Sequence, residues 1–193
     1  MKRFVVVGHL GSTDPDFSLN NLPGAGRMDE LCRCVAASLC LSHGIRRDAE
    51  CLLVLLGGPK APKTIRFSGE SVRSLGPDER NVAGLIKKAL ALPCGTVFRE
   101  SSPGVSVRKG GLAEVLAECG CAVLDEGGED IRGIETVPET FVLSDHQNFS
   151  EEERGLMQDL PACSLGPCIL HADMAIVVLH NELDRRERAD GSD

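Results

Sequence analysis

Residues 163–183, with the sequence CSLGPCILHADMAIVVLHNEL, indicate how the rest of the chain is arranged. The stretch begins as the end of a strand, passes through a loop containing Gly166 and Pro167, and continues into an amphipathic helix. Glycine permits backbone angles that other residues avoid, and proline fixes its own φ angle and has no N–H donor. A loop whose backbone groups face a cleft beside the start of a helix is suited to binding a ligand. The alternative is an ordinary turn before a C-terminal helix, because such turns are common.

The length and composition indicate one folded domain. The chain has 193 residues, of which 42% are apolar, enough to bury a substantial core. Only 3% are aromatic, which argues against a nucleic-acid surface built from stacked rings. No apolar run approaches the roughly 20 residues of a membrane span. The apolar run at residues 4–7 is too short for the core of a signal peptide. We therefore expect a soluble, cytoplasmic protein with no membrane contact.

The nine cysteines do not follow the spacing of a zinc module or a disulfide-rich domain. Their number is odd, and no Cys-x-x-Cys pair is present, although zinc modules usually contain that two-residue spacer. Cys32 and Cys34 fall in a helical pattern, where residues two apart point to different faces. We expect most of the thiols to be small buried side chains in a reducing compartment, and we expect no metal. A cysteine-rich metal module is kept as an alternative.

The acidic residues are concentrated in one part of the chain. The formal net charge of −8, taken alone, argues against a nucleic-acid partner. Residues 125–159 contain eleven acidic and two basic residues, whereas residues 1–124 contain sixteen basic and twelve acidic residues. The first two-thirds of the chain therefore permits a basic face that binds RNA.

Strand patterns alternate with helix patterns along the chain. The expected strands cover residues 2–7, 51–56, 64–67, 105–108, 121–124 and 141–143. The expected helices cover residues 28–42 and 112–119, begin at Pro77 and after Ser150, and include the terminal stretch. This alternation predicts an α/β fold with a mainly parallel sheet and helices on both faces.

Two glycine-containing stretches imitate nucleotide-binding motifs without meeting their requirements. In residues 24–29, GAGRMD, an aspartate stands at the position of the third glycine, and no strand precedes the stretch. In residues 57–64, GGPKAPKT, Pro62 replaces the last glycine of a P-loop, and a strand pattern follows where a helix is required. We exclude both as nucleotide sites.

Three loops follow expected strands in the last third of the chain. They are residues 124–130, 143–146 and 164–172. Ligands of open α/β sheets bind beyond the carboxyl ends of the strands. These loops therefore predict a binding site formed by the C-terminal third.

A series of short motifs, in order along nearly the whole chain, points to one family. They are NLPG at 21–24, GR at 26–27, LCRCV at 31–35, LSHGIRRD at 41–48, PDERN at 77–81, SPG at 102–104, GED at 128–130, SDH at 144–146, SLGP at 164–167, LHA at 170–172 and HNELD at 180–184. The chain resembles the archaeal-type tRNA pseudouridine N1-methyltransferases, which belong to the SPOUT class. One departure is Ser144, because the family commonly has glycine at that position.

The resemblance implies the fold, the activity and the partners. It implies a single SPOUT-like domain over residues 1–193 with a C-terminal trefoil knot, an exception to unknotted topology. The part up to about residue 110 is then the RNA-facing part, and residues 111–193 are the knotted, cofactor-binding part. It further implies a homodimer that methylates N1 of pseudouridine at position 54 in the T-loop of tRNA, with S-adenosylmethionine as the methyl donor.

The resemblance also implies which residues bind the cofactor, through the backbone of the three loops. They are Leu124, Gly128, Leu143, Ser144, Ser164, Leu165, Gly166, Pro167, Cys168 and Ile169.

Methyl transfer to N1 requires a group that accepts the N1 proton. The candidates are Asp145, Asp78 and His171, and no spacing rule singles out one of them. Each also has an ordinary structural use, since Asp78 lies at a helix start, His171 is a potential cap and Asp145 is a turn former. The choice among the three stays open at the level of sequence.

The basic residues that suit phosphate contacts lie in the first two-thirds of the chain. They are Arg27, Arg33, Arg46, Arg47, Arg80, Arg108 and Lys109. Phosphate contacts carry no sequence information, so they do not distinguish tRNA from ribosomal RNA. The alternatives are therefore a methyltransferase for pseudouridine in ribosomal RNA and a noncatalytic RNA-binding dimer.

Overall fold

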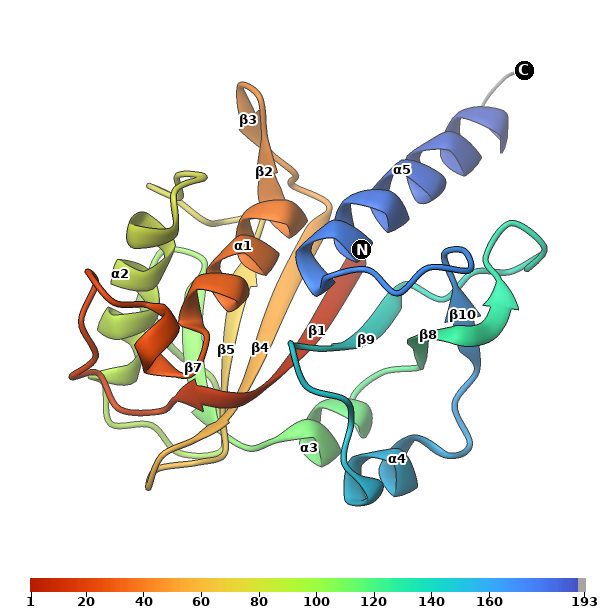
Figure 1. Ribbon diagram of the computed structural model, residues 1–193. Coiled ribbons are helices and arrows are strands. Elements are labelled where there is room, and N and C mark those ends of the chain that lie inside the picture. The colour runs from red at the N-terminus through yellow and green to blue at the C-terminus, as the bar shows by residue number, and fades with distance from the viewer. Residues whose placement is uncertain (191–193) are drawn as a thin grey trace.

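Eight strands form one sheet in which the C-terminal third of the chain pairs with the N-terminal strand (Figure 1). The computed structural model describes residues 1–190. The strands are β1 (Lys2–Ser12), β2 (Cys40–Leu41), β3 (Gly44–Ile45), β4 (Ala49–Gly57), β5 (Lys63–Ser68), β6 (Arg99–Ser102), β7 (Val105–Lys109), β8 (Cys121–Asp130), β9 (Thr140–Ser144) and β10 (Ala162–Ser164). The helices are the 3-10 turn η1 (Pro23–Ala25), α1 (Met28–Leu39), α2 (Glu79–Leu90), α3 (Leu112–Leu116), α4 (Glu151–Met157) and α5 (Ala172–Asp190).

The sheet has a parallel half and an antiparallel half. Its order is β10-β8-β9-β1-β4-β5-β7-β6. The pairings from β10 to β4 are parallel, and those from β4 to β6 are antiparallel. The prediction of a parallel sheet is therefore confirmed for five strands. The antiparallel extension arises from tight connections, as at Gly104, whose φ of 73° closes the turn between β6 and β7.

Helices cover both faces of the sheet, and the alternation of side chains along β1 shows why. Phe4 and Val6 point into a core that α1, α2 and α5 complete, whereas Val5 and Val7 point into a second core under α3 and α4. Figure 1 shows α3 and α4 on the opposite side of the sheet from α1 and α5. Because β1 is buried on both faces, it reads as a continuous apolar run in the sequence.

Several boundaries differ from the sequence-based expectation. The strand expected at residues 2–7 continues to Ser12, and the helix expected at residues 28–42 ends at Leu39. The segment after it turns through the β2–β3 hairpin. Residues 125–130, expected to be a loop, continue β8 because they pair with β10. An acidic, glycine-containing sequence has low strand propensity, and here the pairing with a neighbouring strand overrides that propensity.

The second helix begins two residues later than expected. Pro77 was expected at its first position, but α2 starts at Glu79, and Asp78 is its N-cap. The Asp78 carboxylate accepts hydrogen bonds from the backbone N–H groups of Arg80 and Asn81. These bonds satisfy two of the free donors at the start of a helix.

The N-terminal strand is fixed beneath the C-terminal helix. Asp184 on α5 accepts hydrogen bonds from Lys2 Nζ at 2.9 Å and from Arg46 Nη2 at 2.7 Å. The Arg46 guanidinium, followed by Lys2, lowers the pKa of Asp184 to about 2. His180, also on α5, packs on the ring of Phe4, and burial lowers its pKa to about 4. His180 is therefore a neutral core residue at physiological pH.

Candidate functional site

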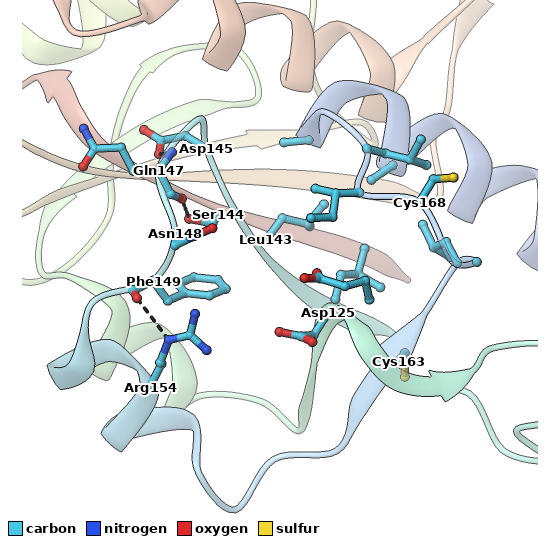
Figure 2. Close-up of a pocket in the computed structure, with 18 residues that line it drawn as sticks. Asp125, Leu143, Ser144, Asp145, Gln147, Asn148, Phe149, Arg154, Cys163 and Cys168 are labelled. Atoms are coloured by element: carbon cyan, nitrogen blue, oxygen red, sulfur yellow. Dashed lines mark hydrogen bonds between the residues drawn. The ribbon is translucent and has the colours of Figure 1, made fainter.

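A cavity lies where the parallel strands β8, β9 and β10 end (Figure 2). Three segments of the chain line it, namely residues 124–126, 143–154 and 163–175 in part. The lining residues are Leu124, Asp125, Glu126, Leu143, Ser144, Asp145, Gln147, Asn148, Phe149, Arg154, Cys163, Leu165, Gly166, Cys168, Ile169, Leu170, Ala172 and Ala175. The three loops expected to form one site therefore lie together at one edge of the sheet.

The β10 loop presents backbone to this cavity. The Ser164 hydroxyl donates to the carbonyl of Gly166 at 3.1 Å and accepts from its N–H at 3.2 Å. Gly166 has a φ of 136°, a value that L side chains rarely adopt. Ile169 follows with a side chain that is 80% exposed. The loop is thus shaped by its own local bonds.

Of the ten residues expected to bind a cofactor, seven line the cavity and three do not. Gly128, Ser164 and Pro167 are absent from its lining. A Cβ atom at Gly128 would lie 2.6 Å from the carbonyl carbon of Ala162 and 2.7 Å from the nitrogen of Cys163. Gly128 therefore permits the close approach of β8 and β10, and Ser164 shapes the β10 loop. Both residues therefore position segments that line the cavity without lining it themselves.

The loop after β9 forms the opposite wall. Ser144, at the position where the family commonly has glycine, donates its hydroxyl hydrogen bond to the carbonyl of Gln147. The Arg154 guanidinium donates to the carbonyl of Phe149 at 3.1 Å, which joins the loop to α4 (Figure 2). Serine at position 144 therefore stabilises the turn, and its side chain is directed along the loop.

His9, at the end of the apolar part of β1, bridges two acidic residues of this wall. Its Nδ1 lies 2.7 Å from Asp145 Oδ1, and its Nε2 lies 3.0 Å from Glu153 Oε2. The backbone N–H of His9 donates to Asp145 Oδ2 at 2.9 Å. The hydrogen bond with Asp145, and then that with Glu153, raises the pKa of His9 to about 9. His9 is therefore an imidazolium at neutral pH, and it fixes both ends of the loop between β9 and α4.

The α4 end of this arrangement was predicted from sequence. Ser150 is the N-cap of α4, and the Ser150 N–H donates to the Glu153 carboxylate in a capping box. The same Glu153 oxygen also lies beside His9 Nε2. The capping-box sequence pattern does not predict this contact.

The three candidate proton acceptors lie in different settings. Asp145 lines the cavity, but its carboxylate already accepts from His9 and from the N–H of Gln147. Asp78 caps α2 and does not line the cavity. His171 lies just before α5 with an exposed side chain, and its carbonyl accepts from Ala175 N–H. The structure therefore places Asp145 in the cavity wall and leaves Asp78 with a structural role, whereas His171 lies between the lining residues Leu170 and Ala172 without lining the cavity itself.

Four of the expected RNA-contact residues hold the fold together. Arg33 bonds acidic residues of α1, α2 and α5, and Arg46 bonds Asp184. Arg47 donates to backbone carbonyls of residues 69 and 72. Arg108 is only 5% exposed, lies 4.4 Å from the centre of the Phe98 ring and pairs with Glu118. These guanidinium groups are largely committed to protein partners.

Of the other three candidates, Arg80 and Lys109 have exposed side chains, as Arg47 does, and Arg27 is partly exposed. Among the side chains of residues 1–187, no ion pair joins Arg80 or Lys109 to an acid. Arg27 is 38% exposed and bonds Asp29 at the start of α1.

The remaining predictions concern thiols, metals and membranes. Five of the nine cysteines are buried and three are partly buried, whereas Cys168 is exposed at the cavity. Within the described part of the chain, no cluster of three His, Cys, Asp or Glu residues has the geometry of a metal site. No helix among residues 1–190 combines the length and apolarity needed to span a membrane.

Sequence reasoning missed several residues of the site. Asp125, Glu126, Gln147, Asn148, Phe149 and Arg154 all line the cavity. For Gln147, Asn148 and Phe149, their position after β9 is a usable signal, because loops at the carboxyl ends of strands carry binding residues, whereas Asp125 and Glu126 lie within β8 and Arg154 lies in α4. His9 had no such signal, since its partners are more than 130 residues away.

The chain matches known proteins along its whole length. The family model described as "Putative SAM-dependent RNA methyltransferase" matches residues 1–188. The tRNA (pseudouridine(54)-N(1))-methyltransferase of Methanocorpusculum labreanum is 56% identical over 191 residues, which cover 96% of this chain and 98% of that protein. The corresponding proteins of Methanospirillum hungatei and Haloferax volcanii are 56% and 45% identical, over 97% and 96% of their lengths and 96% and 95% of this chain.

A solved structure shows the same fold. The crystal structure of Archaeoglobus fulgidus Nep1 bound to S-adenosylhomocysteine superposes with a TM-score of 0.66 at 16% identity, covering 95% of this chain and 97% of that chain. Together with the match over residues 1–188, these similarities show that the chain belongs to the family of S-adenosylmethionine-dependent RNA methyltransferases.

Proposed function

We propose that this protein transfers a methyl group from S-adenosylmethionine to N1 of pseudouridine 54 in the T-loop of tRNA. The observation that carries the proposal is the cavity lined by residues 124–126 of β8 and by the loops after β9 and β10. It occurs in a chain that shares 56% identity with tRNA (pseudouridine(54)-N(1))-methyltransferases over 96% of its length. The names of these relatives favour tRNA over ribosomal RNA as the substrate.

The lining of the cavity suits the chemistry of the methyl donor. Leu124, Leu143 and Leu165 provide an apolar surface for an adenine ring, and the β10 loop provides backbone groups for its polar edge. Asp125 and Glu126 bring negative charge to the rim, where a sulfonium or an ammonium group is stabilised. Bound S-adenosylmethionine supplies a methyl group activated by the positive sulfur.

The substrate base has one feature that uridine lacks. Pseudouridine is joined to its ribose through carbon, so N1 carries a free proton and is a weak nucleophile until that proton leaves. The protein must therefore hold N1 in line with the methyl group and provide a proton acceptor nearby. The wall formed by residues 143–149 is placed to do both, because it lies between the cavity and the start of α1.

The RNA backbone is proposed to lie over Arg27, Arg80 and Lys109. Arg80 and Lys109 are exposed and Arg27 is 38% exposed, whereas Arg47, although also exposed, donates to backbone carbonyls. Arg27 stands at the start of α1, beside the acidic cluster that faces the cavity wall. Arg33, Arg46, Arg47 and Arg108 then act indirectly, by holding the surface that carries the contacts.

The test is methyl transfer from labelled S-adenosylmethionine to two matched T-loop hairpins, one with pseudouridine and one with uridine at the target position. Label on the pseudouridine hairpin alone, located at N1 by mass spectrometry, is the expected result. Equal labelling of both hairpins would show that a different atom is the acceptor. Cofactor binding without transfer to either hairpin or to full tRNA would favour ribosomal RNA, and RNA binding without turnover on any substrate would favour the noncatalytic alternative.

We further propose that two copies associate through the α5 side of the cavity. Ile169, Leu170, Met174 and Val177 are 80%, 40%, 57% and 56% exposed; Met174 and Val177 share one face of α5 at i,i+3 spacing, and Ile169 and Leu170 lie just before that helix. Contiguous apolar surface of this kind on a soluble protein marks an interface. A second copy is the proposed occupant.

Replacing Met174 and Val177 together with glutamate is expected to convert the dimer into a monomer. Two buried carboxylates facing their symmetry mates would each lose hydration without gaining a partner. Light scattering coupled to gel filtration measures the change in mass. The matched control is Leu156→Glu, because Leu156 is 47% exposed on α4, away from this face. A monomeric unchanged protein, or a dimer that survives the double change, would contradict the proposed interface.

The remaining features implied by the resemblance belong to the same proposal. Residues 111–193 are proposed to form the knotted, cofactor-binding part and residues 1–110 the RNA-facing part. The placement of β10 beside β8, followed by the return of the chain to α5 against α1, supports this division. A cytoplasmic location follows from the tRNA substrate.

A further inference from the structure

Glu30 is a buried carboxylate without a hydrogen-bond partner among the described residues. It lies in the first turn of α1, and its side chain is 1% exposed. Neither Oε1 nor Oε2 accepts a hydrogen bond within residues 1–190. Arg27 Nη2 lies 3.6 Å from Oε2, and the ring nitrogen Nδ1 of His146 lies 3.8 Å from it. A carboxylate held in this way costs folding free energy, which makes it a candidate for a functional role.

The pKa of Glu30 is consistent with its surroundings. Burial is the main cause that raises it, and the negative charge of Asp145 raises it further, while Arg27, His146 and His171 act in the opposite direction. Glu30 therefore faces groups from α1, from the end of β9 and from the start of α5. These segments meet at the border between the cofactor cavity and the surface that carries Arg27.

His146 lies beside this carboxylate, in the loop whose neighbouring residues line the cavity. Its side chain is 24% exposed, and its two chain neighbours, Asp145 and Gln147, both line the cavity. His146 Nδ1 lies 3.4 Å from Asp145 Oδ2 and 3.8 Å from Glu30 Oε2, so the ring nitrogen faces two carboxylates. His146 Nε2 lies 3.4 Å from the amide nitrogen of Gln147, which is turned toward the cavity side.

The tautomer of His146 follows from these neighbours. The Gln147 amide nitrogen is only a donor, so it favours an unprotonated Nε2. The ring proton then lies on Nδ1, where the carboxylates accept it. Asp145 is already bonded to the His9 imidazolium, whereas Glu30 has no bonded partner. Glu30 is therefore the acceptor whose charge is available to His146.

We propose that His146 is the general base that takes the N1 proton of pseudouridine, and that Glu30 is the residue that positions it. This inference rests on the proposed function. The N1–H of the bound base displaces the Gln147 amide as the donor to His146 Nε2, Nε2 then takes that proton, and Nδ1–H donates to Glu30 as positive charge develops on the ring. The N1 electron pair forms the new bond to the methyl carbon, while the carbon–sulfur bond breaks and leaves its electrons on sulfur. The imidazolium then returns its proton to solvent.

The distances of 3.4 and 3.8 Å from His146 Nδ1 to the two carboxylates are long for hydrogen bonds. A small movement of the ring would shorten them. Catalytic hydrogen bonds are often longer in the absence of substrate and shorten in its presence.

The test compares His146→Asn and Glu30→Gln with the unchanged protein in single-turnover methyl transfer to the pseudouridine hairpin across a range of pH. His146→Asn is expected to lower the rate about 100-fold and to remove the fall in rate toward acidic pH. Glu30→Gln is expected to lower the rate roughly tenfold and to move that fall to lower pH, because the imidazole loses its anionic partner. The affinity for S-adenosylmethionine should stay within about twofold of the unchanged protein in both variants.

Two control variants separate this role from a structural one. His43→Asn changes an exposed histidine in the β2–β3 turn and should leave the rate unchanged. Glu50→Gln changes a carboxylate that is 6% exposed but bonded to Arg3 at 3.1 Å, and it should lower the melting temperature without moving the pH profile. Glu30→Gln should melt at the same temperature as the unchanged protein or higher, since it removes an unbonded buried charge.

Each remaining outcome has one meaning. An unchanged rate and pH profile in His146→Asn would overturn the assignment of the base. An unchanged profile in Glu30→Gln, or a loss of stability like that of Glu50→Gln, would overturn the role of Glu30. Absence of transfer by the unchanged protein would instead overturn the proposed function itself.

Discussion

Replacing His9 with alanine should lower the free energy of unfolding by about 3–5 kcal/mol, because it leaves a buried charge without its partner. The Asp145 side chain is 0% exposed and that of Glu153 is 9% exposed, and His9 is the cation between them. The same change releases the loop between β9 and α4, which provides much of the cavity wall. We therefore expect the affinity for S-adenosylmethionine to fall at least about tenfold, or about 1.4 kcal/mol.

Chemical denaturation and calorimetric titration with S-adenosylmethionine measure the two effects. His43→Ala is the matched control, because His43 is exposed in the turn between β2 and β3. A His9→Ala protein that unfolds at the same denaturant concentration as the control would show that the bridge contributes little.

The pH dependence of stability provides an independent check on the charge of His9. Asp145, then Glu153, raises its pKa from the ordinary value of 6.5 to about 9. Because the folded state binds this proton more tightly, the stabilisation is complete below about pH 6.5 and is lost as the pH rises through 9. The size of this contribution is on the order of 3 kcal/mol. The decline in stability between those pH values should be absent in His9→Ala.

Replacing Gly128 with alanine should lower the free energy of unfolding by about 2–3 kcal/mol, the range for overpacking a close contact. The new methyl group would lie within 2.6–2.7 Å of backbone atoms of Ala162 and Cys163. Since these neighbours are backbone atoms, β10 must move away from β8 to accommodate the methyl group. The loop that follows β10 would move with it, so binding of S-adenosylmethionine should weaken roughly tenfold or more.

Gly127→Ala is the control for this prediction. The corresponding methyl group at Gly127 would contact only the Asp125 side chain, at 3.2 Å, and a side chain can rotate away. Urea denaturation and cofactor titration of the two variants should therefore differ clearly. Equal stability and equal affinity would show that the spacing between β8 and β10 does not control the cavity.

Local patterns were sufficient to predict the elements whose causes are local. The capping box of Ser150 and Glu153 starts α4 as expected, and the apolar run of β1 is buried on both faces. The prediction was less successful where pairing decides the structure, as at residues 125–130. Those residues form a strand because they pair with β10, and nothing in the local sequence indicates that pairing.

The same limit applies to the site. The three loops could be predicted, because strand ends at one edge of a parallel sheet converge. The charges could not, since His9 meets Asp145 across 136 positions and Arg46 meets Asp184 across 138. Arginine suits both phosphate and carboxylate partners, so its sequence position does not reveal which one it meets. Glu30 illustrates the point, because only the fold shows that it is buried beside His146.

The central position of β1 determines the order in which a ribosome can complete this protein. β1 is made first and can pair with β4 early, but its other neighbour, β9, begins only at Thr140. Until then one edge of an apolar strand has no partner, and such an edge is prone to pair with other chains during synthesis. Every strand that leads into the cavity is synthesised after residue 120. During synthesis, the strands β1 and β4–β7 are therefore available first, and the strands β8–β10 that lead into the cavity are available last. The capacity to hold the methyl donor is thus acquired at the end of synthesis.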